Sequence, residues 1–224
     1  MPRYALQGIK LQIPRDCVND KLEELLAVGE YEIKELTGVK RHLKPGDRVL
    51  ELGGGAGYLA VQAAIIAGAA NVTTVEANPQ MVRVIGKNLT LNDVEGVRVM
   101  HGAVVPDDFK DDAIGFDVKP VFWASSIANG KAADDTKRVD VPALRLGALL
   151  EDVQPNLVVM DVEGAEVSLA RQHWPDFVQT IIMETHPQQY PPATIRDIFD
   201  GMSAAGFAYM PWGSRGNVVV FQRI

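Results

Sequence analysis

Short apolar runs alternate with amphipathic segments along most of the chain, and such runs predict buried β-strands. They lie at residues 48–52, 72–76, 97–101, 157–162 and 180–185. Residues 58–68 are apolar almost all round, as in a helix packed against a sheet. Asn78 and Pro79 provide an N-cap and a first-turn proline for the next helix. Strands that alternate with helices predict an α/β fold, with a parallel sheet covered by helices on both faces.

Two ends and one internal segment depart from this alternation. Residues 207–210 and 217–222 flank a glycine-containing turn, which predicts an antiparallel hairpin at the edge of a mostly parallel, seven-stranded sheet. Apolar residues recur at helical spacing ahead of the first strand, so we expect residues 1–46 to form a helical region. The pattern over residues 104–155 is looser. We interpret this segment as an insertion that shapes a substrate pocket.

Composition limits the classes of function. With 224 residues, 47% of them apolar and 23% charged, the chain suits one globular domain over residues 1–224. A net charge of −7 without a Lys/Arg run argues against a nucleic-acid partner. The single cysteine, Cys17, has no internal disulfide partner, so we expect a cytoplasmic location. The longest apolar stretch, residues 58–72, is shorter than the roughly 20 residues that span a bilayer, so no membrane partner is expected. The oligomeric state stays open.

A glycine-rich turn follows the first predicted strand. Residues 51–58 read Glu-Leu-Gly-Gly-Gly-Ala-Gly-Tyr, and glycines let the backbone turn sharply and approach a ligand closely. The start of the next helix adds free N–H groups for an anionic group of that ligand. Glu76 ends the second predicted strand roughly 20 residues further on, where an acidic side chain binds ribose hydroxyls. Together these features predict a nucleotide-like ligand.

The spacing of the glycines separates two kinds of ligand. A dinucleotide fingerprint requires Gly-x-Gly-x-x-Gly or Ala, and the register Gly55, Gly57 and Ala60 satisfies it, so an NAD-dependent dehydrogenase stays open. Residues 51–57 also read acidic-x-Gly-x-Gly-x-Gly, which resembles the first motif of class I methyltransferases. The cofactor of those enzymes carries a sulfonium and no phosphate. A carboxylate at position 51 therefore suits it better than it suits a pyrophosphate.

Acidic side chains gather at the ends of two later strands. Residues 160–166 read Met-Asp-Val-Glu-Gly-Ala-Glu, and residues 183–187 read Met-Glu-Thr-His-Pro. Carboxylates at buried strand ends are costly unless they contact a ligand, water or donors. With the glycine turn, and with Tyr31-Glu32 ahead of the first strand, these residues resemble the FkbM family of S-adenosylmethionine-dependent methyltransferases. That family often has Lys in place of Met160 and Asp-x-Gly-Ala-Asn in place of residues 51–55.

The resemblance implies a Rossmann-like class I methyltransferase fold and O-methylation of a small-molecule or sugar-like hydroxyl. The implied cofactor is S-adenosylmethionine, with S-adenosylhomocysteine as its product. In such enzymes the acid of the first motif orients the methionine end of the cofactor, and residues after the third strand hold the adenine. The expected cofactor-binding residues are Glu51, Gly53, Gly55, Gly57, Tyr58, Glu76, Ala77, Gly102, Ala103 and Asp161.

A hydroxyl acceptor benefits from a general base, which contributes roughly 10²–10⁴ in rate. Asp161, Glu163 and His186 are the candidates, because they lie at neighbouring strand ends. His186 has the best intrinsic titration range, although capping a turn is an equal alternative for it. Glu163 has an equal alternative in bracing its own loop. We expect no required metal, even though Asp161, Glu163 and Glu184 offer oxygen ligands suited to magnesium.

Three other functions stay open. Residues 53–57 also resemble the loop of aminopropyltransferases, which use the same fold. The dehydrogenase is disfavoured by the acid at position 51. A catalytically silent protein would use the cofactor as structural support or as a signal. The sequence does not identify the acceptor.

Overall fold

The computed structural model describes residues 2–119, 121–122, 125–128 and 136–224. Its main sheet contains β3 (Val49–Leu52), β4 (Val72–Glu76), β5 (Arg98–His101), β10 (Leu157–Met160), β11 (Thr180–Glu184), β12 (Phe207–Arg215) and β13 (Val218–Arg223). The α-helices are α1 (Asp20–Val28), α2 (Ile33–His42), α3 (Tyr58–Ala67), α4 (Pro79–Leu91), α5 (Leu146–Val153), α6 (Glu166–Leu169) and α7 (Pro192–Ala204).

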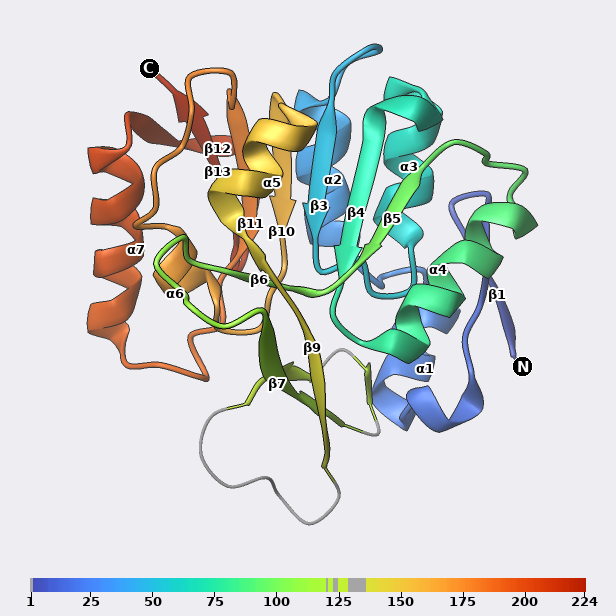
Figure 1. Ribbon diagram of the computed structural model, residues 1–224. Helices are drawn as coiled ribbons and strands as arrows, with labels where there is room; N and C mark the ends of the chain where they lie inside the picture. The colour runs from blue at the N-terminus through green and yellow to red at the C-terminus, as the bar shows by residue number, and fades with distance from the viewer. Residues whose placement is uncertain (1, 120, 123–124, 129–135) are drawn as a thin grey trace.

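The main sheet has the strand order β12-β13-β11-β10-β3-β4-β5 (Figure 1). The strands from β5 through β4, β3 and β10 to β11 pair in parallel. β13 runs antiparallel to both of its neighbours, β11 and β12. The predicted α/β fold, the seven-stranded sheet and the C-terminal hairpin are therefore confirmed.

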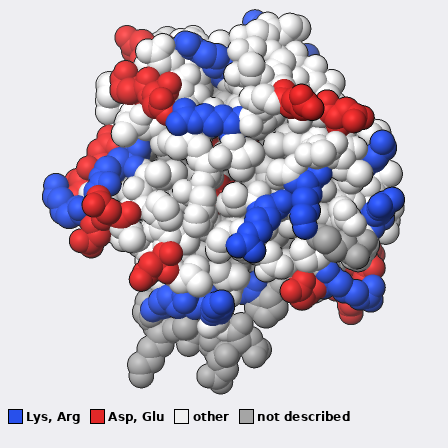
Figure 2. Space-filling model, turned by 45° about the vertical axis from the view of Figure 1, so that its right-hand side comes forward, with Lys and Arg blue, Asp and Glu red and all other residues white. Residues whose placement is uncertain are grey.

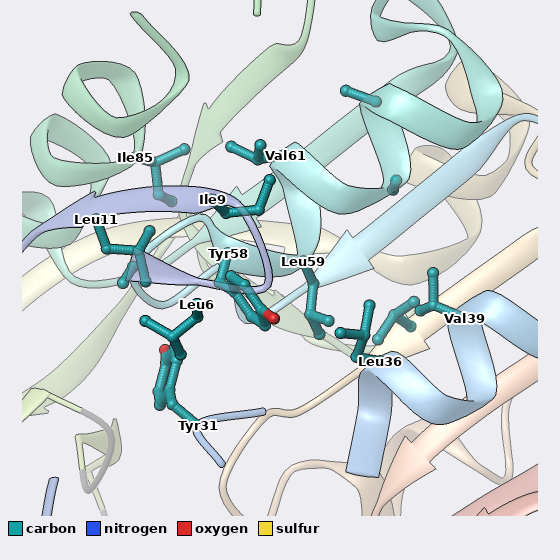
Figure 3. Packing of buried hydrophobic residues seen from close by; sticks show 14 of the residues in the cluster. Leu6, Ile9, Leu11, Tyr31, Leu36, Val39, Tyr58, Leu59, Val61 and Ile85 are labelled. Atoms are coloured by element: carbon teal, nitrogen blue, oxygen red, sulfur yellow. The ribbon is translucent and has the colours of Figure 1, made fainter. Parts of the chain in front are cut away.

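Both faces of the sheet are buried, since successive residues of a strand point to opposite faces. Val49 of β3 belongs to a core cluster with Leu36 of α2 and Leu59 of α3. Figure 3 shows Leu36 and Leu59 side by side. The next residue, Leu50, belongs to the cluster on the other face, which includes Ile198 of α7. Helices on both faces fix the sheet and leave its strand ends free for a site.

The N-terminal region differs from the expected helical region over residues 1–46. The helices α1 and α2 are present, but β1 (Arg3–Leu6) and β2 (Ile9–Gln12) form a hairpin ahead of them. Its turn holds Gln7 and Gly8, both with positive φ, as tight hairpin turns require. In β2 buried Ile9 and Leu11 alternate with less buried residues, a period-two pattern that predicts a strand.

The segment expected as an insertion, residues 104–155, contributes to a second sheet. This sheet has the order β6-β9-β7-β8, with β6 (Ala103–Val105), β7 (Ala113–Val118), β8 (Ser126–Ile127) and β9 (Lys137–Arg145). Arg138 of β9 holds Asp117 of β7 through two hydrogen bonds of 2.7 and 2.9 Å. Figure 1 shows β7 and β9 beyond the carboxyl ends of the central strands.

The glycine turn is fixed between two neighbours of β3. The N–H groups of Gly53 and Gly54 both donate to the carbonyl of Val75 in β4, at 2.9 and 3.0 Å. On the other side, a Cβ added to Gly53 would lie 1.8 Å from the carbonyl oxygen of Asp161, and Gly53 has a φ of 91°. Only glycine fits this position, because both its conformation and the space around it exclude a side chain.

We predict that Gly53→Ala destabilises the protein by about 3 kcal/mol or more, because a backbone carbonyl blocks the added methyl group. Gly46→Ala is the matched control: Gly46 has a φ of 84° but nothing within 4 Å of an added Cβ. This control should lose about 1 kcal/mol of stability. Thermal unfolding measures both variants, and equal losses would contradict the packing of the turn against Asp161.

Candidate functional site

A cavity of about 1120 Å³ opens at the carboxyl edge of the main sheet. Its volume exceeds the roughly 300–1,000 Å³ typical of a site for one drug-sized ligand, so a cofactor and an acceptor can share it. Strand ends, the start of α2 and the second sheet form its wall. The predicted site residues that line it are Gly53, Gly55, Glu76, Ala77, Gly102, Ala103, Asp161, Glu163 and His186.

Glu76 lies at the end of β4 and faces the glycine turn. Its carboxylate accepts hydrogen bonds from the N–H of Gly55 at 2.8 Å and from the N–H of Asn78 at 2.7 Å. Burial raises the pKa of Glu76 to about 7, although these N–H groups oppose the shift. The buried carboxylate is therefore held at one place on the cavity wall.

Next to Glu76, part of the cavity wall is built from small residues. The N–H of Gly102 donates to the backbone carbonyl of Glu76 at 3.0 Å, which joins the end of β5 to β4. A Cβ on Gly102 would lie 2.7 Å from the side chain of Leu144. Ala77 and Ala103 line the same part. Small side chains let a flat heterocycle approach the backbone closely.

Three predicted cofactor residues do not line the cavity. Glu51 and Tyr58 are buried, and Gly57 is the N-cap of α3. Glu51 lies beneath Gly54, facing Thr74 of β4. Burial raises the pKa of Glu51 to about 8, and the Thr74 hydroxyl opposes the shift. The structure thus puts this carboxylate behind the glycine turn.

His186, just after β11, is held in a buried network. Its Nδ1 lies 3.0 Å from Oε1 of Glu166, which is fully buried at the start of α6. Tyr190 donates to the same oxygen at 2.8 Å, and the N–H of Gly164 donates to the other carboxylate oxygen at 2.7 Å. Glu166 is a residue of the predicted signature for which sequence reasoning found no role, and it fixes the orientation of the imidazole.

The other ring nitrogen of His186, Nε2, faces the cavity. It lies 3.4 Å from Oδ1 of Asp161 and 3.6 Å from Oε1 of Glu163. Burial alone would lower the pKa of His186, but Asp161, Glu163 and Glu166 together raise it above its usual value. Burial raises the pKa of Asp161, and His186 opposes the shift. The arrangement therefore favours a protonated His186 and leaves a carboxylate as the group able to accept a proton.

Tyr31 and Glu32, just before α2, also line the cavity. Glu32 has a φ of 51°, and a non-glycine residue in this region costs about 1–3 kcal/mol. Sequence reasoning noted the pair as part of a resemblance without giving it a role. A polar residue just before a helix can contact a ligand or cap the helix. The sequence around it does not distinguish these two roles.

Glu35 of α2 and Glu184 of β11 form a second pair of carboxylates that sequence reasoning did not place together as site residues. Burial, followed by the facing Glu184, raises the pKa of Glu35 to about 7. Burial and Asp161 raise the pKa of Glu184 to about 7. Asn217 donates to Glu184 and accepts from Lys34 at 2.6 Å. These groups come from distant parts of the chain, so only the fold brings them together.

One oxygen each of Asp161 and Glu163 and a ring nitrogen of His186 lie within 4.8 Å of one another. This donor set has the size to hold a metal ion. The raised pKa of His186 favours a proton at the nitrogen instead. The expectation that no metal is required stays a prediction.

Comparison with known proteins identifies relatives among methyltransferases. Residues 28–114 match a family model described as the TRM5/TYW2 methyltransferase domain. A ribosomal protein L11 methyltransferase of Acetivibrio thermocellus is 34% identical over 103 residues, which are 45% of this chain and 30% of that protein. The chain thus matches less than a third of the length of that relative. Both matches include the class of enzyme in their names, in agreement with the predicted transferase and its S-adenosylmethionine cofactor.

Solved structures share the fold at low sequence identity. Trm5b of Pyrococcus abyssi has a TM-score of 0.52 and 13% identity, covering 98% of this chain and 55% of that one. A methyltransferase of Pyrococcus furiosus has a TM-score of 0.51 and 12% identity, covering 98% and 91%. A precorrin-6y C5,15-methyltransferase of Geobacter metallireducens has a TM-score of 0.50 and 12% identity, covering 94% and 91%. The predicted class I methyltransferase fold is confirmed.

The predicted membership of the FkbM family is wrong, because the matching family model is the TRM5/TYW2 methyltransferase domain. That match covers residues 28–114, which include the glycine turn and Glu76, whereas the signature at residues 160–166 lies outside it. Ligand-binding residues gather at strand ends throughout α/β sheets of this kind. A short acidic motif at such a place therefore does not identify a family.

We predict that Glu35→Gln flattens the pH dependence of stability. The pKa of Glu35 is raised from 4.5 to about 7, so its stabilising contribution is full below pH 4.5 and is lost as the pH rises through 7. Between about pH 5 and pH 8, the free energy of unfolding of the unaltered protein should fall by about 2–3 kcal/mol more than that of the variant.

Denaturant unfolding at several pH values measures this difference. Glu24→Gln, at an exposed position of α1, controls for the removal of one charge. Parallel profiles for the unaltered protein and Glu35→Gln would contradict the buried state of Glu35.

Proposed function

We propose that this protein is an S-adenosylmethionine-dependent methyltransferase that acts on a hydroxyl of a small molecule. The observation that carries the proposal is a set of buried polar atoms around the cavity. Tyr31 and Glu32 each have a buried side-chain oxygen that makes no hydrogen bond of normal geometry with the described residues. A buried polar atom without a partner costs about 1–3 kcal/mol, so a polar ligand that completes these atoms is favoured.

Charge further selects the ligand. Burial raises the pKa values of Glu32 and Asp161, and neighbouring carboxylates raise them further. A cationic ligand stabilises the ionised form of such groups. S-adenosylmethionine carries a sulfonium and an ammonium group, whereas a dinucleotide carries an anionic pyrophosphate. The cavity therefore supports the first ligand over the second.

The order of strand ends gives the proposed orientation of the cofactor. Gly102 and Ala103, just after β5, would receive the adenine, and Glu76 at the end of β4 the ribose hydroxyls. Gly53 and Gly55 at β3 come next, followed by the acidic ends of β10 and β11. With the cofactor in this orientation, the acidic end of the cavity is left for the acceptor.

When bound, S-adenosylmethionine supplies an electrophilic methyl group. Asp161 is the proposed base that takes the proton of the acceptor hydroxyl, because its carboxylate faces the cavity and its pKa is raised by burial. His186 positions this carboxylate from 3.4 Å. Glu163, which accepts a hydrogen bond from Gln189, braces the loop after β10. Most of the remaining rate enhancement comes from holding the two reactants in line.

A small acceptor is supported by residues in and beside the second sheet that line the cavity. Phe116, Phe122, Ser125 and Ile127 line it, so residues 104–155 are the proposed acceptor-shaping segment. On the face in Figure 2, basic and acidic side chains are interspersed, which gives no support there for a nucleic-acid partner. No helix among the described residues could cross a membrane. The proposal treats residues 1–224 as one cytoplasmic methyltransferase domain.

One alternative has its own support. The paired carboxylates of Glu35 and Glu184 suit an amine as well as a hydroxyl, since an ammonium group would stabilise both in their ionised form. Aminopropyl transfer to an amine is therefore the second candidate. Mass spectrometry of the product separates the two reactions.

We predict that calorimetry detects binding of S-adenosylmethionine and S-adenosylhomocysteine but not of NADH. Glu76→Gln should weaken both by about 10-fold to 100-fold, because a charged acceptor of the ribose hydroxyls is lost. Glu95→Gln, at an exposed position, is the matched control and should bind as the unaltered protein does. Tight binding of NADH, or no effect of Glu76→Gln, would contradict the assignment.

We predict that Asp161→Asn lowers the turnover number by about 10²–10⁴, a larger factor than its effect on the cofactor dissociation constant. Methyl-labelled S-adenosylmethionine and a panel of hydroxylated small molecules measure turnover. Ser168→Ala, in α6, is the control for a local change without loss of a cavity carboxylate. Full turnover in Asp161→Asn would exclude Asp161 as the base.

A further inference from the structure

We propose that Tyr31 and Glu32 form the subsite for the amino-acid end of the cofactor, with the Glu32 carboxylate receiving its α-ammonium group. The inference rests on the proposed function. The resemblance to class I methyltransferases implied this role for Glu51, whose side chain lies behind the glycine turn and not on the cavity wall.

The two side chains meet the glycine turn at one point. A Cβ added to Gly55 would lie 3.0 Å from the hydroxyl oxygen of Tyr31 and 3.2 Å from Oε1 of Glu32. The N–H of Gly55 donates to Glu76, the proposed ribose contact. The absence of a side chain at Gly55 thus leaves a path between the ribose contact and this pair. A cofactor whose ribose is bound at Glu76 would extend its amino-acid chain past Gly55.

The pair is buried but incompletely bonded. Tyr31 is 4% exposed, and its hydroxyl lies near the Glu32 carboxylate and the backbone of Ala56 without making a hydrogen bond of normal geometry to the described residues. The buried Oε2 of Glu32 likewise makes no such hydrogen bond. The Tyr31 hydroxyl can donate to the carboxylate of an amino acid, and the Glu32 carboxylate can accept from its ammonium group.

The backbone conformation of Glu32 directs its carboxylate into the cavity, and this side chain does not cap the helix. Glu32 is the N-cap residue of α2, yet its side chain makes no cap hydrogen bond. Its left-handed conformation is one that side chains rarely adopt. Strain of this kind persists where a function depends on it. Helix formation alone does not account for Glu32.

Aromatic packing holds Tyr31 in place. Its ring lies 6.1 Å from the ring of Tyr58 and 6.4 Å from the ring of Phe122. Figure 3 shows Tyr31 beside the packed core, with Tyr58 nearby. Tyr58 begins α3, and Phe122 belongs to the proposed acceptor-shaping segment. The position of the Tyr31 hydroxyl is therefore set by packing against α3 on one side and the proposed acceptor-shaping segment on the other.

Charge favours an ammonium group at Glu32. Its carboxylate lies near those of Glu51, Glu35 and Asp161, and burial with these neighbours raises its pKa. A cationic group between them relieves the repulsion that a second carboxylate would increase. The ammonium group is accordingly placed at Glu32, and the cofactor carboxylate at Tyr31.

Calorimetry with two ligands tests the proposal. S-adenosylhomocysteine carries the amino-acid end and no sulfonium, and 5′-methylthioadenosine lacks the amino-acid end. Glu32→Gln should weaken binding of S-adenosylhomocysteine by about 10-fold to 100-fold and binding of 5′-methylthioadenosine by less than about twofold, because only the first ligand carries the ammonium group. Tyr31→Phe should show the same selectivity with a smaller loss, because it removes one neutral hydroxyl.

Equal weakening of both ligands, or no weakening of either, would overturn the subsite while leaving the proposed cofactor in place. If the unaltered protein binds neither ligand, the proposed function itself fails, and the subsite fails with it.

Glu32→Gly separates ligand contact from folding. Glycine adopts a φ of 51° without strain, so this variant should melt at or above the temperature of the unaltered protein. It should nevertheless lose affinity for S-adenosylhomocysteine as Glu32→Gln does. A variant that melts well below the unaltered protein would show that Glu32 serves the fold and would overturn the proposal.

Discussion

The close contact between Gly53 and the backbone of Asp161 determines how the rest of the site is built. A chain with a side chain at position 53 could not bring the end of β3 this near to the end of β10. The same turn is tied to β4 through the carbonyl of Val75. Three adjacent strand ends are thereby brought to one cavity. Every proposed contact with the cofactor depends on this arrangement.

The second constraint is the concentration of negative charge at that edge. Carboxylates from α2, β4, β10 and β11 face one cavity, and burial raises the pKa of Glu35, Glu76 and Glu184 to about 7 in each case. His186 offsets part of this charge, and Glu166 keeps the imidazole oriented behind it. The site is thus partly neutralised from within and completed by a cationic ligand.

The sequence predicted the fold well because its strands are apolar and its helix starts carry clear signals. Asn78 and Pro79 begin α4 as expected, and the glycine turn follows β3. The hairpin at Ile9 and Leu11 was missed because its strands are short and the nearby helical pattern dominated the interpretation. The family was wrong because a short acidic motif at strand ends is shared more widely than one family.

The site was predicted in outline, since positions at strand ends follow from the fold. Its electrostatics were not, because Glu35, Glu166 and Tyr190 acquire their roles through contacts between distant segments. Intrinsic titration range favoured His186 as a base, whereas three surrounding carboxylates favour its protonated form. Burial and neighbouring charge are properties of the folded chain, and they cannot be read from the amino-acid sequence alone.

The most direct test of this account is a crystal structure of the protein with S-adenosylhomocysteine. We expect the adenine beside Gly102 and Ala103, the ribose hydroxyls on Glu76, and the chain of the thioether passing over Gly55. Ligand density elsewhere on the molecule, or a ribose turned away from Glu76, would contradict the account.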